Sequence, residues 1–240
     1  MQVIYSFGKN IPFYIAQFKQ YVFGSDAQRD AWELLLNKCQ SKGVPVFILS
    51  AGNKLGIIRM LQLMGLDAMF EEVLCTNDNE LVNPRTQNGA HNFQRKTKYE
   101  VIRIILRERS LGSEPEPIGY LMDDDSGNDD HTVPNKTIQF VNVNSVVQPQ
   151  TPEQTSNVFY NFVATYSPSL QSLISSRTFA DVNVINRVAS EVEQDNSNIK
   201  ILFIDFDKTF SQYAGALPFH DDTFISEFYK RFNLNARHIW

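Results

Sequence analysis

Two aspartates, Asp205 and Asp207, follow an apolar run near the C-terminal end of the chain. The run, residues 199–204 (IKILFI), has the length and composition of a strand buried on both faces of a parallel sheet. Open α/β sheets bind ligands at the carboxyl ends of such strands. Two carboxylates held together there need a cation or an unusual proton balance, so the pair indicates a metal site or acid–base chemistry. Taken alone, the pair also fits an ordinary turn, where aspartate is common.

Three further sets of polar residues stand at predicted strand ends or at a helix start. They are Ser50 with Gly52 two residues later, the acidic residues Asp123, Asp124, Asp125 and Asp129, and the basic residues Lys96 and Lys98. Each set has an ordinary alternative as a loop serine, a solvated turn or surface lysines. Because a helix start favours anions and parallel strands end at one edge of a sheet, we expect the sets to form one site.

Helix and strand signals alternate along the chain and predict the elements that would position these residues. Helical spacing is present after Ser25 up to Gly43 and over residues 99–109 and 221–232, whereas strand signals cover 44–49, 73–75, 118–122, 137–143 and 199–204. Residues 151–194 show interrupted helical spacing and no strand signal. This alternation predicts an α/β fold, a Rossmann-like parallel sheet with helices on both faces.

Composition narrows the classes of partner. The 240 residues carry a net charge of −5 and no basic stripe, which argues against nucleic acid as a partner. No apolar run is long enough for a membrane span, and the N-terminal segment lacks the features of a signal peptide. These observations predict a cytoplasmic protein.

The strings DFDKT (205–209), ILSAG (48–52) and DDDSGND (123–129), with a lysine that opens a helix, together resemble the four motifs of the haloacid dehalogenase superfamily. Within it they are similar to phosphoserine-phosphatase-like phosphatases. The family normally begins with the Asp-x-Asp strand, which here comes last, so the chain resembles a circular permutant. The resemblance implies one domain, 1–240, with a core at about 25–143 and 199–210. A helical permutation linker at about 151–195 and a small cap formed by 1–24 and 211–240 complete this expectation.

The resemblance also implies a role for each residue. Asp205 would be the nucleophile and Asp207 the general acid and base. Mg²⁺ would bind Asp205, Asp207 through its backbone carbonyl, and one acidic-motif carboxylate. That carboxylate is Asp125 with Asp129 in support, or Asp124 if the frame shifts by one. The expected phosphate-binding residues are Ser50 and Lys98, with Lys96 the alternative lysine, and Thr209 would brace the loop.

The implied activity is hydrolysis of phosphomonoesters, with a phosphorylated small molecule or a phosphoprotein as substrate. Both chain ends are rich in aromatic residues, among them Tyr5, Phe7, Phe18, Tyr21, Tyr213, Phe219, Phe224 and Phe228. An aromatic-lined entrance would suit phosphotyrosine or another aryl phosphate, while packing of the two ends against each other is the alternative. A phosphotransferase and a non-catalytic phosphate-binding module are the other functional hypotheses. A secreted bacterial effector is the alternative to a cytoplasmic location.

Overall fold

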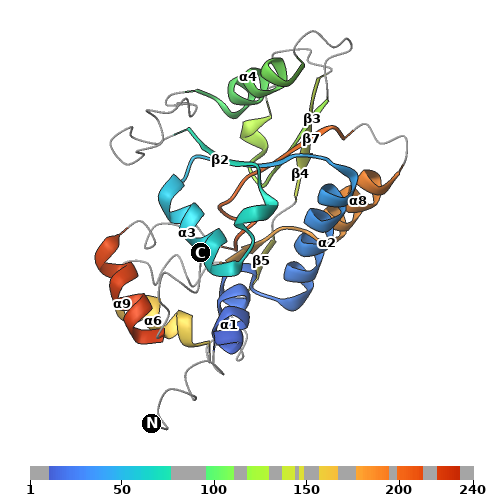
Figure 1. Ribbon diagram of the computed structural model, residues 1–240. Coiled ribbons are helices and arrows are strands. Elements are labelled where there is room, and N and C mark those ends of the chain that lie inside the picture. The colour runs from blue at the N-terminus through green and yellow to red at the C-terminus, as the bar shows by residue number, and fades with distance from the viewer. Residues whose placement is uncertain are drawn as a thin grey trace.

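A five-stranded, all-parallel sheet forms the centre of the protein in the computed structural model (Figure 1). The strands, in their order across the sheet, are β2 (Glu72–Cys75), β1 (Val46–Ser50), β7 (Ile201–Ile204), β3 (Gly119–Asp123) and β4 (Ile138–Asn142). The structure describes residues 11–76, 96–110, 118–129, 137–143, 146–148, 157–166, 177–194, 199–212 and 221–232. The predicted α/β class with a Rossmann-like parallel sheet is therefore confirmed.

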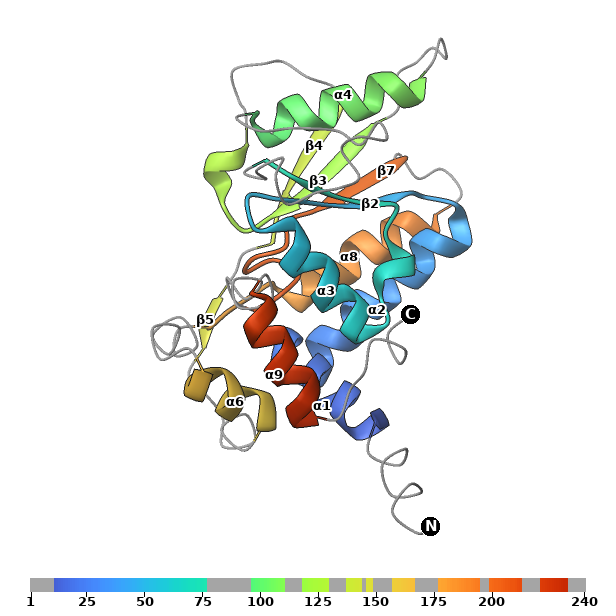
Figure 2. The same cartoon turned by 60° about the vertical axis from the view of Figure 1, so that its left-hand side comes forward.

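Helices cover both faces of the sheet (Figure 2). The helices that flank it are α2 (Asp26–Lys42), α3 (Lys54–Met64) and α8 (Val182–Glu193) on one face and α4 (Lys98–Ser110) on the other. Side chains alternate along β7, so Leu202 and Ile204 join the core on the first face, and Ile201 and Phe203 join the core beneath α4. All four are almost fully buried, as expected for a central parallel strand.

The helix α2 starts and ends where the sequence signals place it. The Ser25 side chain accepts a hydrogen bond from the backbone N–H of Gln28 at 3.1 Å, which caps the start of α2. Gly43 ends α2 with a φ of 66°, a left-handed conformation that glycine adopts without strain. The predicted start and stop of this helix are confirmed.

Three helices pack against one another through aromatic rings, away from the sheet. They are α1 (Ile11–Phe23), α6 (Val158–Tyr166) and α9 (Asp222–Phe232), which lie together in Figures 1 and 2. The ring centroid of Phe159 lies 5.3 Å from that of Phe18 and 5.4 Å from that of Phe228. These three rings are buried, so the packing alternative holds for Phe18 and Phe228 of the chain ends. Tyr5, Phe7, Tyr213 and Phe219 lie outside the described residues.

The segment expected to be a helical linker is more varied than its sequence signals. It contains α6, which joins the aromatic group, and β6 (Arg177–Phe179), which pairs antiparallel with β5 (Val146–Gln148). Both strands have three residues, too few for an alternating pattern to appear in the sequence. Residues 151–156, 167–176 and 195 of the expected linker, and 1–10, 213–220 and 233–240 of the expected cap, lie outside the described residues.

Two short 3₁₀ helices, η1 (Asp67–Met69) and η4 (Ser126–Asn128), complete the described elements. Among the helices that the structure describes, none combines the length and apolar character needed to cross a membrane.

Replacement of Phe228 by alanine tests the aromatic group. Phe228 is completely buried and its ring contacts those of Phe18, Phe159 and Phe162. We expect Phe228→Ala to lower the free energy of unfolding by about 3–5 kcal/mol, because the lost ring leaves a cavity. Phe13→Ala is the matched control and should change it by less than about 0.5 kcal/mol, since Phe13 is 54% exposed. Urea denaturation measures both, and equal effects would contradict the packing described here.

Candidate functional site

A lysine bridges two aspartates at the carboxyl edge of the sheet. Lys98, the first residue of α4, places its Nζ 2.6 Å from Asp123 Oδ2 and 2.7 Å from Asp205 Oδ1. The two aspartates lie beside each other because β7 pairs with β3, with Met122 opposite Ile204 one residue earlier. All three side chains are at least nine-tenths buried. The site therefore has a buried ammonium between two buried carboxylates.

Burial sets the protonation of this group. Burial raises the pKa of Asp205 to about 7, an effect that Lys98 opposes and that Asp123 reinforces. Burial by itself would lower the pKa of Lys98, but the charges of Asp205 and Asp123 outweigh it and the pKa of Lys98 is raised. Lys98 is therefore an ammonium at neutral pH, and Asp205 exchanges its proton near that pH in the absence of a metal.

Three carboxylates converge closely enough to bind one metal ion. Asp123, Asp124 and Asp205 each offer one oxygen, and these oxygens lie within 4.8 Å of one another. With all groups ionised, three carboxylates and one ammonium leave two negative charges, which a divalent cation would balance. Burial and the neighbouring Asp123 raise the pKa of Asp124, as expected for carboxylates gathered without a metal. Oxygen donors of this kind suit Mg²⁺ or Ca²⁺.

Of the aspartates in the acidic motif, Asp123 and Asp124 belong to the three-carboxylate group, whereas Asp125 and Asp129 form other hydrogen bonds. Asp125 caps η4, where its Oδ1 accepts a hydrogen bond from the backbone N–H of Gly127 at 2.8 Å. The Asp129 carboxylate accepts one from the Tyr99 hydroxyl at 2.7 Å. Of the two predicted metal ligands of this motif, Asp124 belongs to the three-carboxylate group, whereas Asp125 does not.

Sequence reasoning placed Asp123 in the acidic set without a role of its own, and it missed Asn128. Asp123 is completely buried, and the Asn128 amide donates to its two carboxylate oxygens at 3.2 and 3.0 Å. The signal for Asp123 was its position at the end of a buried strand, directly comparable with that of Asp205. Asn128 gave no signal, since asparagine is common in turns.

Thr209 and Ser50 hold the loops around the carboxylates. The Thr209 hydroxyl accepts a hydrogen bond from the backbone N–H of Asp124 at 3.0 Å and lies 3.2 Å from Asp124 Oδ1 as a donor. Ser50 ends β1, beside β7, and its Oγ accepts the backbone N–H of Gly52 at 2.9 Å. Thr209 thus joins the loop after β7 to the loop after β3, and Ser50 brings β1 to the same edge.

The two candidate lysines differ in burial. Lys96 is exposed to solvent, whereas Lys98 is buried against the aspartates. The structure therefore brings Lys98, and not Lys96, together with the other predicted residues. Asp207 is half-buried on the loop that follows β7, two residues from Asp205.

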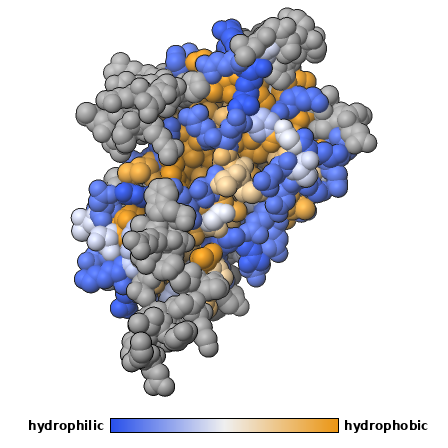
Figure 3. Space-filling view, viewed as in Figure 1, coloured by the Kyte–Doolittle hydropathy of each residue, from blue (hydrophilic) through white to orange (hydrophobic). Residues whose placement is uncertain are grey.

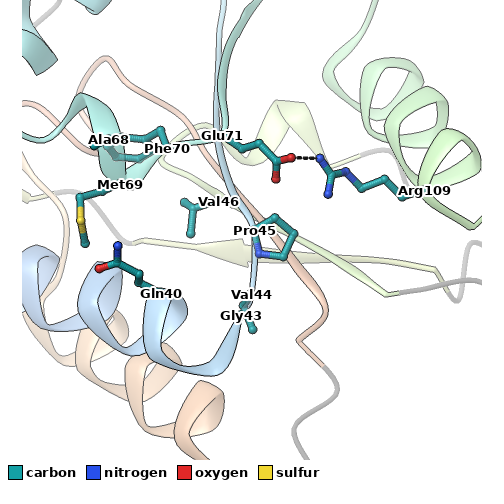
Figure 4. A pocket seen from close by; sticks show the side chains of 10 residues that line it. All are labelled: Gln40, Gly43, Val44, Pro45, Val46, Ala68, Met69, Phe70, Glu71 and Arg109. Atoms are coloured by element: carbon teal, nitrogen blue, oxygen red, sulfur yellow. Dashed lines mark hydrogen bonds and ion pairs between the residues drawn. The ribbon is translucent and has the colours of Figure 1, made fainter.

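A shallow hollow of about 370 Å³ lies at the opposite end of β1 and β2 (Figure 4). It is lined mainly by apolar residues, with an ion pair between Glu71 and Arg109 at its rim. On the face of the molecule shown in Figures 1 and 3, hydrophobic residues gather across the middle, where Figure 1 places β2. None of the predicted site residues lines this hollow.

No model of a known family, no curated protein and no solved structure matches the chain.

The raised pKa of Asp205 predicts how stability varies with pH. An unfolded aspartate has a pKa of about 3.9, whereas the folded value is about 7. Between these values the folded state holds a proton that the unfolded state has released, so this carboxyl contributes less to stability as pH rises through that interval. We expect Asp205→Asn, which stays neutral, to raise the melting temperature of the metal-free protein more at pH 8 than at pH 5.

Thermal unfolding in EDTA at the two pH values measures this difference. Asp67→Asn, at an exposed aspartate outside the site, is the matched control and should leave the pH dependence as it is in the wild type. If the difference between Asp205→Asn and the wild type is the same at both pH values, the burial argument for Asp205 is wrong.

Proposed function

We propose that the chain is a magnesium-dependent phosphatase that hydrolyses phosphomonoesters through an aspartyl-phosphate. The observation that carries this proposal is the buried Asp205 carboxylate, which Lys98 bridges to Asp123 at the carboxyl edge of a parallel sheet. Such an edge is where open α/β sheets bind ligands. The resemblance of the four motifs to haloacid dehalogenase-like phosphatases supports the same reaction.

In the first step, a carboxylate oxygen of Asp205 attacks phosphorus. A bond forms between that oxygen and phosphorus while the bond from phosphorus to the leaving oxygen breaks. Asp207 begins protonated and gives its proton to the leaving oxygen, so the product leaves as an alcohol. The position of Asp207 on the loop after Asp205 supports this division of roles.

In the second step, water attacks the phosphorus of the aspartyl-phosphate. Asp207, now a carboxylate, takes a proton from the water as the new bond to phosphorus forms. The bond between phosphorus and Asp205 breaks, which releases inorganic phosphate and restores both aspartates. The overall change is the addition of one water molecule to the phosphomonoester.

The remaining residues would bind the phosphoryl oxygens and the metal ion. The Lys98 ammonium is 2.7 Å from Asp205 Oδ1, beside the oxygen that would carry the phosphoryl group, and the Ser50 hydroxyl would donate to a phosphoryl oxygen. Asp205, Asp123 and Asp124, with the backbone carbonyl of Asp207, would hold Mg²⁺. When bound, Mg²⁺ supplies the charge that offsets the carboxylates and the phosphoryl oxygens.

Hydrolysis of p-nitrophenyl phosphate tests the activity and its nucleophile. We expect the purified protein to release p-nitrophenol with Mg²⁺, to lose activity in EDTA, and to regain it when Mg²⁺ is added back. Asp205→Asn should abolish turnover because the amide cannot form the intermediate, while Asp67→Asn, remote from the site, serves as the control.

The alternatives separate in the same assay. No turnover of aryl, sugar or amino-acid phosphates with any divalent metal from pH 5 to 9 would exclude the phosphatase and favour a non-catalytic phosphate-binding module. Release of p-nitrophenol in excess of phosphate when an alcohol is present would identify a phosphotransferase. Turnover by Asp205→Asn would show that Asp205 is not the nucleophile.

The choice of metal ligand in the acidic motif gives a second prediction. Since Asp124 lies with Asp123 and Asp205 while Asp125 caps η4, we expect Asp124→Asn to weaken Mg²⁺ binding more than Asp125→Asn does. Loss of one carboxylate should raise the Mg²⁺ concentration for half-maximal activity by about 10–100-fold, the range seen when residues around metal sites are changed. Metal titration of both variants measures this, and the reverse order would make Asp125 the ligand.

A further inference from the structure

Gly52 lies between the serine motif and the Asp-x-Asp motif, and two functional oxygens occupy the space beside it. A Cβ atom built on Gly52 would lie 2.9 Å from Asp207 Oδ2 and 3.1 Å from Ser50 Oγ. The third neighbour, Ile57 Cδ1, is 3.5 Å away. Any other residue at position 52 would bring its Cβ too close to the Asp207 carboxylate.

The backbone conformation at position 52 does not itself require a glycine. The described glycines with positive φ are Gly24, Gly43 and Gly65, and Gly52 is not among them. An alanine could therefore adopt the backbone conformation at position 52, and the constraint is the absence of a side chain. The backbone N–H of Gly52 also donates to Ser50 Oγ at 2.9 Å, which fixes the residue against the serine.

We propose that Gly52 is a positioning residue for Asp207: it leaves open the space in which the Asp207 carboxyl group lies beside Ser50, ready for proton transfer. The inference rests on the proposed phosphatase function and adds to it a residue that acts through the general acid. It also explains how a side chain from the loop after β7 can approach the loop after β1.

Of the crowded neighbours, Asp207 is the one that would move. Ser50 is 1% exposed at the end of β1, a strand paired on both sides by β2 and β7. Ile57 is completely buried in the core beneath α3. Asp207 is half-buried on a loop, and its carboxylate can rotate about two side-chain bonds. An added methyl group at position 52 would therefore displace the carboxylate.

Dependence on the leaving group distinguishes this role from a structural one. p-Nitrophenolate is a stable anion and leaves without a proton, whereas an alkoxide needs one from Asp207. The ratio kcat/KM reports the first chemical step, in which that proton is transferred. We expect Gly52→Ala to lower kcat/KM for glycerol phosphate by about 100-fold, within the usual contribution of a general acid. For p-nitrophenyl phosphate we expect a fall of less than about tenfold, because general-acid catalysis contributes little there.

A double-mutant cycle tests whether Gly52 acts through Asp207. In an Asp207→Asn background, Gly52→Ala should produce little further loss on glycerol phosphate, because the proton donor is already absent. Gly52→Ala combined with Ile57→Val is a second variant for the case in which the single variant folds poorly. Valine lacks Cδ1 and so leaves more room beside position 52.

The outcomes separate the inference from the function on which it rests. An equal loss on both substrates, no loss on either, or a full additional loss in the Asp207→Asn background would overturn the role of Gly52 while leaving the phosphatase intact. Wild-type protein that turns over neither substrate would overturn the proposed function and the inference together. A selective loss on glycerol phosphate that disappears in the Asp207→Asn background is the result expected.

Discussion

The ion pair of Lys98 with Asp123 and Asp205 is the interaction on which the site depends. Two carboxylates buried side by side would repel each other, and burial without a partner would force both to take up protons. The ammonium of Lys98, on α4, offsets this repulsion. Asp205 after β7 can therefore lie beside Asp123 at the end of β3. Removal of Lys98 would leave two uncompensated carboxylates in the interior.

The arrangement still leaves an excess of negative charge, and this excess is informative. Asp124 adds a third carboxylate, and Thr209 orients it through two contacts. A protein selected only for stability would replace such a group with apolar residues, since buried ion pairs often contribute less than good hydrophobic packing. The raised pKa of Asp205 shows that burial disfavours its charged form. Perturbed pKa values of this kind are typical of functional sites.

Much of the fold follows from the sequence because its signals are local. The alternation of helix and strand signals predicted the parallel sheet, and Ser25 and Gly43 predicted the limits of α2. The positions of Asp205, Ser50 and Lys98 at one edge followed from the general rule that parallel strands end together. The circular permutation and the cap stay predictions.

What could not be predicted depends on side-chain contacts between distant segments. Nothing local distinguishes Asp124 from Asp125, since their hydrogen-bond partners separate them. The motif resemblance favoured Lys98 over Lys96, but only the folded structure shows that Lys98 is buried. The membership of α6 in the aromatic group with α1 and α9 is likewise a tertiary contact, as is the partnership of Asn128 with Asp123. Such choices arise only when the chain is folded.

The place of β7 in the sheet has a consequence for synthesis on the ribosome. β7 lies between β1 and β3, yet it is the last strand of the sheet to be made. Until it emerges, β1 and β3 each present an open edge to the solvent, because β7 is the strand that pairs with both. Between synthesis of β4 and synthesis of β7 the nascent chain therefore holds two incomplete halves, and exposed strand edges favour aggregation during that interval. Addition of the nucleophile strand both closes the sheet and completes the site, so a truncated chain would have neither.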